Sequence, residues 1–179
     1  DGGLDLFARQ AGTLNRRITI NSSGEICFNE DSADIDFRVE SNGNANMLFV
    51  DGGSDHVNIG TATDHGGKLN IETGDNSVNL VLVCTDTDGN EGPIMDFTRD
   101  AGNVPSDGDV MGLIRFRNDN TDLVMHNYAA IESRIVDVSA GTEDGRLELM
   151  TCVAGTENVS RILMTGEDTI LNDNQLDID

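Results

Sequence analysis

The sequence predicts an all-β fold, and three observations lead to this prediction. Apolar and charged residues alternate with a period of two over many short segments, which is typical of strands that bury one face. Gly, Asp and Asn, which favour tight turns, make up about a third of the 179 residues and separate these segments. Apolar residues at helical spacing are confined to residues 4–11, which are long enough for two helical turns at most.

The clearest alternation covers residues 34–40, where Ile35, Phe37 and Val39 are expected to face inward and charged residues to face solvent. Strands at intervals of about 8–12 residues with polar turns between them are typical of all-β domains. The other predicted strands are residues 25–28, 46–50, 57–59, 68–72, 78–84, 94–98, 112–117, 123–128, 131–138, 146–153, 159–164 and 169–172.

Composition divides the chain into three predicted parts. Residues 1–17 are interpreted as an N-terminal extension or linker, residues 18–75 as a first β-rich segment, and residues 76–179 as a second one with longer strands. The tetrapeptide Ala-Gly-Thr-Glu occurs at 140–143 and again at 154–157. Because a solenoid normally needs three or more repeats, these copies are interpreted as two successive β-turns.

Charge and residue types exclude several classes of function. The chain has 33 acidic and 11 basic residues, a net charge of -22, so a basic surface for nucleic acid is not expected. The sequence contains no apolar run long enough to cross a bilayer, and membrane insertion is not expected. Cys27, Cys84 and Cys152 lie far apart and are expected to be small buried thiols. With few aromatic residues, a core has to be aliphatic.

Catalytic and metal-binding motifs give little signal. His56, His65 and His126 are scattered, and no hydrolase or phosphate-loop motif is present, so we expect neither an enzyme nor a cofactor. The oxygen-rich turn at residues 86–91 makes Asp86, Asp88 and Asn90 candidate calcium ligands. The turn departs from an EF-hand loop at two required positions, and the alternative interpretation is a solvated turn.

So many strands in one acidic chain leave many sheet edges to protect. Two arrangements fit: a sandwich or barrel within one chain, or strands from several chains wound around a common axis. Arginines in or beside the strands are expected to form cross-strand or interchain ion pairs. They are Arg38, Arg99, Arg115, Arg117, Arg134, Arg146 and Arg161.

A set of stretches along the chain is distinctive as strings of residues. In the first half these are residues 28–41, 47–51 and 57–61; in the second half they are residues 84–88, 96–100, 108–112, 114–117, 141–146 and 153–156. These stretches resemble segments of tail fibre proteins of bacteriophages, especially marine ones. The likeness covers roughly residues 18–172 and consists of structural strings without catalytic motifs.

The resemblance implies a virion appendage: an intertwined homotrimeric fibre of short antiparallel strands and hairpins, with a shaft like a β-helix or β-prism. It implies a structural role between the virion attachment and the receptor-binding tip. Expected partners are two further copies of the chain, other phage tail or baseplate proteins, and a host cell-surface receptor reached through the complete fibre.

Two rival functions stay open at this stage. A tailspike that degrades polysaccharide on a parallel β-helix would use aromatic residues to stack sugars, and the lack of Trp and the single Tyr count against it. A calcium-dependent adhesin or a capsid decoration protein is the other alternative.

Overall fold

The computed structural model describes residues 2–29, 32, 34–100, 102 and 104–166, together with the backbone of residues 169–171. These residues form strands and turns and contain no helix, which confirms the all-β prediction. Contacts divide the chain into two compact units, Asp1–Asp88 and Gly89–Asp179. The division therefore falls at residue 88, whereas composition placed it at residue 75.

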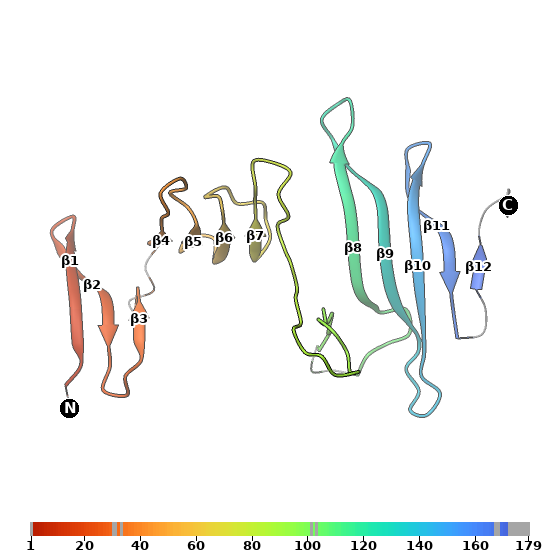
Figure 1. Cartoon of the computed structure of the whole chain (residues 1–179), viewed down its shortest axis with the longest axis horizontal. Helices are drawn as coiled ribbons and strands as arrows, with labels where there is room; N and C mark the ends of the chain where they lie inside the picture. The colour runs from red at the N-terminus through yellow and green to blue at the C-terminus, as the bar shows by residue number, and fades with distance from the viewer. Residues whose placement is uncertain are drawn as a thin grey trace. The chain divides into compact units, whose positions relative to one another are not determined.

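The first unit begins with a three-stranded antiparallel sheet. Its strands are β1 (Leu4–Gln10), β2 (Thr13–Ile20) and β3 (Ile26–Phe28), and β2 lies in the middle (Figure 1). Ala11 and Gly12 join β1 to β2 with φ angles of 48° and 87°. Two successive positive φ angles make a two-residue turn whose twist matches that of the strands it connects.

This sheet corrects two expectations for the start of the chain. The candidate helix at residues 4–11 is strand β1, and the proposed extension or linker at residues 1–17 contains β1 and part of β2. Leu6 pairs with Ile18 and Phe7 with Arg16, so Arg17 on β2 is the extra residue of a β-bulge.

The first unit continues with a four-stranded sheet, formed in chain order by β4 (Phe37–Val39), β5 (Leu48–Asp51), β6 (His56–Ile59) and β7 (Leu69–Ile71). Its first three strands are antiparallel, whereas β6 and β7 run parallel and need the connection formed by residues 60–68.

Aromatic rings join the two sheets of the first unit. The ring centroids of Phe28, at the end of β3, and Phe37, at the start of β4, lie 4.9 Å apart. Phe37 is half-buried, while Val39, which was also expected to face inward, is exposed. The short strand β4 therefore buries only part of its apolar face.

The second unit contains a five-stranded antiparallel sheet of consecutive hairpins (Figure 1). Its strands are β8 (Val110–Asp119), β9 (Met125–Asp137), β10 (Asp144–Val153), β11 (Thr156–Met164) and β12 (Thr169–Leu171). The order across the sheet is β12-β11-β10-β9-β8. Each strand therefore pairs with its neighbours in sequence.

The turns of this sheet confirm the interpretation of the repeated tetrapeptide. Its first copy lies in the turn between β9 and β10, and Ala154 and Gly155 of the second copy form the turn between β10 and β11. The predicted strands at 123–128 and 131–138 are largely one continuous strand, β9.

Two predicted strands, residues 78–84 and 94–98, are absent. Residues 78–83 have no strand partner and make no backbone–backbone hydrogen bond with any described residue. An apolar alternation indicates that a segment is buried against some surface, and this chain alone does not supply that surface to residues 78–83.

The chain buries little apolar surface. Ala130 and Met150 are the only fully buried hydrophobic side chains among the described residues. The accessible surface of the 19.2 kDa chain is 13536 Å². A compact domain of this mass exposes roughly 8,400 Å², and two separate compact domains of half this mass together expose roughly 10,200 Å². The excess is therefore independent of how the two units are placed.

Candidate functional site

One face of the five-stranded sheet carries a block of twelve uncharged residues. Residues that pair directly across strands point to the same face, so the register identifies its members. Ile114, Ile131, Leu149 and Ile162 form one continuous aliphatic row across β8 to β11. The adjacent rows on this face contain Phe116, Ala129, Thr151 and Val159 on one side, and Gly112, Ser133, Leu147 and Met164 on the other. We call these twelve residues the charge-free face.

The opposite face of the same sheet carries ion pairs. Glu132 accepts a hydrogen bond from Arg134, and Arg146 Nη2 lies 3.7 Å from Glu148 Oε2. Each pair joins residues two apart on one strand, which places both partners on the same face. The buried Met150 lies in the row next to these charges. The sheet is therefore strongly two-sided.

The charge-free face is partly uncovered: Ile114, Phe116 and Leu147 are exposed, and its other nine residues are half-buried. The exposed fraction is 39% for Ile114 and 55% for Phe116. The side chain of Phe97 packs over Gly112, where an added Cβ would lie 3.0 Å from Phe97 Cβ. The twelve residues carry no charge themselves, and one charged side chain reaches them, because Arg161 donates to the Thr151 hydroxyl at 2.9 Å. In a chain with 25% charged residues, a block of twelve uncharged residues is suited to contact with protein.

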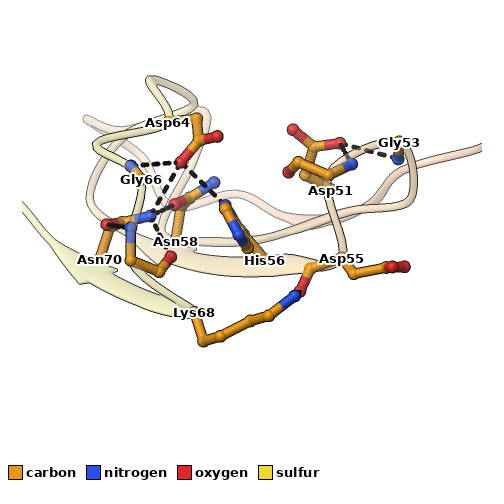
Figure 2. A network of polar contacts seen from close by, with 11 residues as sticks. Asp51, Gly53, Asp55, His56, Asn58, Asp64, Gly66, Lys68 and Asn70 are labelled. Carbon is orange, nitrogen blue, oxygen red and sulfur yellow. Dashed lines mark hydrogen bonds and ion pairs between the residues drawn. The ribbon is translucent and has the colours of Figure 1, made fainter.

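A second candidate region is the polar network that closes the β6–β7 connection (Figure 2). Asn58 on β6 and Asn70 on β7 are register partners, and Asn70 Nδ2 donates to Asn58 Oδ1 at 2.6 Å. Asn70 also donates to the carbonyl oxygen of Gly67 at 3.0 Å, and its Oδ1 accepts from the Gly67 amide at 3.1 Å. The two asparagines thereby fasten the parallel strands to the loop between them.

Asn58 is completely buried, and Asn70 is 7% exposed. A buried amide without hydrogen bonds costs roughly 1–3 kcal/mol, so burial at this point depends on the loop that satisfies Asn70. The Nδ2 atom of Asn58 has no hydrogen-bond partner among the described residues.

Carboxylates complete the network. Asp64 Oδ1 accepts from the Gly66 amide at 2.7 Å and lies 2.9 Å from His56 Nδ1. The Gly66 amide, followed by His56, lowers the pKa of Asp64 below its ordinary value. Glu72 Oε2 lies 2.7 Å from His65 Nε2, and this hydrogen bond is the main cause that lowers the pKa of Glu72. Both acids are therefore held in the ionised form.

Gly60 begins this connection and provides a test of its geometry. Its φ angle is +87°, and an added Cβ would overlap with the carbonyl oxygen of Glu72. Gly66 has a φ angle of +82° but faces open space. We expect Gly60→Ala to lower the free energy of unfolding by about 3 kcal/mol and Gly66→Ala by about 1 kcal/mol. Urea denaturation of both variants checks this, and equal losses would contradict the described close approach of Gly60 to Glu72.

Asp75 provides a test of pH dependence. Hydrogen bonds from Ser77 and Thr73 lower its pKa from 3.8 to about 2. A folded-state pKa below the unfolded value stabilises the fold above pH 3.8, and this contribution is lost as the pH falls from 3.8 to about 2. We expect Asp75→Asn to lower the Tm at pH 6 and to reduce the fall in Tm between pH 4 and pH 2. Circular dichroism melts measure both, with Asp96→Asn as the control because Asp96 accepts no hydrogen bond from the described residues.

The candidate calcium ligands lie on either side of the boundary between the units. Asp86 and Asp88 end the first unit, Asn90 lies at the start of the second, and all three are exposed. Asp86 Oδ1 accepts a hydrogen bond from the Asp88 amide at 3.2 Å. Within the described residues, no group of three or more His, Cys, Asp or Glu side chains is arranged to hold a metal ion.

The histidines pair with carboxylates, and the cysteines differ from expectation. His56 lies 2.9 Å from Asp64 with a side chain that is 15% exposed, His65 lies 2.7 Å from Glu72, and His126 lies 2.8 Å from Glu157. The prediction of buried thiols is wrong: Cys84 is exposed, and the other two cysteines are half-buried. Cys84 follows residues 78–83, which are all exposed.

Several of the arginines form ion pairs, but three of these pairs join residues two apart in sequence and are not the expected cross-strand pairs. Arg38, Arg134 and Arg146 each pair with a glutamate two residues away, and Arg99 pairs with Asp109 at 3.0 Å. The remaining members of the predicted set, Arg115, Arg117 and Arg161, make no ion pair with a described carboxylate. Arg161 donates instead to the Thr151 hydroxyl at 2.9 Å.

The asparagine pair was not predicted, although the sequence contains a signal for it. A triplet with Asn between two aliphatic residues occurs at residues 57–59, again at 69–71, and a third time at 78–80. The first two triplets lie side by side in β6 and β7. A repeated polar residue between apolar ones, at a spacing suited to a parallel connection, was the sequence feature that marked this region.

No protein family model, curated protein or solved structure matches this chain. Among the described residues, no helix is long and apolar enough to span a membrane.

Proposed function

We propose that this chain is a non-enzymatic structural component of a bacteriophage tail fibre, and that three copies assemble into a rigid β-rich shaft. The charge-free face of the five-stranded sheet is the observation that carries the proposal. A single open sheet with such a face requires a partner surface, and identical copies provide three such faces at the same level of the fibre.

The exposed area is large enough for this kind of assembly. The surface exceeds the value for two compact half-size domains by roughly 3,000 Å². Permanent complexes commonly bury roughly 2,000–5,000 Å², and their interfaces resemble a domain core that has been divided in two. The excess surface therefore supports a permanent assembly better than a transient contact.

The distribution of charge also supports a fibre. With the charge-free faces toward a common axis, the ion pairs of Glu132 with Arg134 and of Glu148 with Arg146 would face outward. A net charge of -22 per chain would keep separate fibres apart in solution. Rigid display of several receptor-binding tips raises effective affinity without new contacts, which is the mechanical contribution of a shaft.

Within this proposal, the chain's neighbours in the virion are other tail or baseplate proteins, and the complete fibre contacts a receptor on the host surface. These assignments rest on the resemblance of the strand segments to phage fibre proteins.

The solution mass tests the proposal. Multi-angle light scattering of the unheated protein, over a hundredfold range of concentration, is expected to give three times 19.2 kDa throughout. A chain that remains a monomer at the highest concentration would overturn the proposed assembly. A reducing-sugar assay on host polysaccharide serves as the second measurement, and product formation there would replace the structural role with that of a tailspike.

A further inference from the structure

We infer that residues 78–80 of one copy of this chain add as a strand to the free edge of β7 in a second copy. This inference rests on the self-association in the proposed function and identifies a specific contact within it. The contact would extend the four-stranded sheet β4-β5-β6-β7 by one parallel strand supplied in trans.

The first step concerns the segment that is donated. Residues 78–83 contain five aliphatic residues and Asn79, and the aliphatic side chains are 46–74% exposed. Their backbone is free of hydrogen bonds to other backbone groups among the described residues. A segment that is apolar on both faces and has unpaired amides is typical of a strand in the interior of a sheet. It requires both a partner edge and cover on its two faces.

The second step concerns the edge that receives it. β7 pairs with β6 on one side only, and among the described strands nothing pairs with its other side. Leu69 at the start of β7 is 57% exposed. A free edge beside exposed aliphatic side chains is the usual template for addition of a strand from another chain.

The third step is the match between segment and edge. The triplet at 78–80 has the same pattern as the triplets that already pair in β6 and β7. In the same register Val78 would lie beside Leu69, Asn79 beside Asn70, and Leu80 beside Ile71. Asn79 would then continue the Asn58–Asn70 ladder, in which stacked amides hydrogen-bond from strand to strand. Asn70 Oδ1 accepts one hydrogen bond, from Gly67, and a carbonyl oxygen has a second lone pair to offer.

The final step explains why the donor is a second copy. Residues 73–77 form a compact turn: Thr73 Oγ1 donates to Asp75 Oδ1 at 2.7 Å, and Asp75 Oδ1 accepts from the Ser77 amide at 2.8 Å. In its own chain, Asn79 Nδ2 lies 3.5 Å from the carbonyl oxygen of Ile71, at the end of β7 and not beside Asn70. This turn holds the segment out of register with its own β7, and an identical chain offers the same edge without that constraint.

Disulfide trapping tests the contact. In a background of Cys27→Ser, Cys84→Ser and Cys152→Ser, the variant Leu69→Cys with Val78→Cys is oxidised and run on a non-reducing gel. Neighbouring strands place paired Cα atoms about 5 Å apart, within the range of a disulfide. We expect covalent multimers in the majority of chains. The control pair, Leu69→Cys with Val81→Cys, shifts the register by three residues and is expected to give at least tenfold fewer multimers.

A second variant tests the same contact without cysteines. Leu80→Pro removes an amide from the added strand, whereas Glu91→Pro places proline in an exposed part of the chain outside residues 78–83. We expect Leu80→Pro to raise the dissociation constant of the assembly at least tenfold, while the circular dichroism spectrum of the monomer stays the same. Glu91→Pro is expected to leave the dissociation constant unchanged.

The outcomes separate this inference from the proposed function. The wild-type protein is first shown to be trimeric. If the variant Leu69→Cys with Val78→Cys then gives no covalent multimers, or gives disulfides only within single chains, the strand addition alone is overturned. Equal amounts of multimers from both cysteine pairs would also overturn it. A monomeric wild-type protein overturns both the strand addition and the proposed assembly.

Discussion

Under the proposed assembly, Ile114→Lys is expected to convert the protein into single chains, whereas Leu113→Lys leaves it assembled. The two residues are neighbours on β8 with exposed fractions of 39% and 37%, but they lie on opposite faces of the sheet. Only Ile114 belongs to the charge-free face. Loss of one buried isoleucine removes roughly 2 kcal/mol per copy, and the buried ammonium group adds a larger penalty.

Sedimentation equilibrium measures this effect as a dissociation constant. We expect the constant to rise by at least about 1,000-fold for Ile114→Lys, because each 1.4 kcal/mol of lost binding free energy is a factor of ten and all three copies contribute. Lysine lowers the net negative charge equally in both variants, so added electrostatic repulsion between chains cannot explain a difference between them. If both variants remain assembled, the charge-free face is not the interface.

Asn70→Ala is expected to unfold the β6–β7 connection. The substitution removes four hydrogen bonds, with Asn58 Oδ1, Gly67 O, the Gly67 amide and Asp64 Oδ1, and it leaves the buried Asn58 without its partner. Each orphaned buried group costs roughly 1–3 kcal/mol, so we expect the free energy of unfolding of the first unit to fall by about 3 kcal/mol. Hydrogen exchange of the amides in β6 and β7 checks this result locally.

Asn42→Ala is the matched control, because Asn42 is exposed and its side chain makes no hydrogen bond with a described residue. Its exchange rates should equal those of the wild-type protein. Unchanged protection of β6 and β7 in Asn70→Ala would mean that the backbone pairing holds these strands without the asparagine ladder.

Sequence analysis predicted the strands best where each strand finds its partner in an adjacent hairpin. Residues 146–153 were expected as a strand and form most of β10, whose partners are the strands just before and after it. In such hairpins, the alternation of apolar residues specifies the same pairing register as the position of the turn. The same alternation at residues 78–84 did not produce a strand, because a period of two indicates burial but not which chain provides the cover.

The polar network of Asn58 and Asn70 could not be predicted from the alternation of apolar and polar residues. Asn58 and Asn70 meet because β6 and β7 run parallel, and the direction of a pairing is not encoded in the period of either strand. Strand β1 was missed because the apolar residues between positions 4 and 11 also fit a helical spacing, so their period did not identify a strand. The charge-free face, in contrast, needed the cross-strand register before its members could be recognised as one surface.

The order of strands in the five-stranded sheet has a consequence for the time course of folding. Each strand pairs with its predecessor in the chain, so the contacts are local and hairpins can form within microseconds to milliseconds while a chain is still alone. Under the proposed assembly, the aliphatic faces are covered only when chains meet, which makes that step bimolecular or of higher order. Refolding would therefore show a fast phase independent of protein concentration and a slow phase that accelerates with it. During the interval between the two phases, the newly formed sheets expose the surface most prone to aggregation.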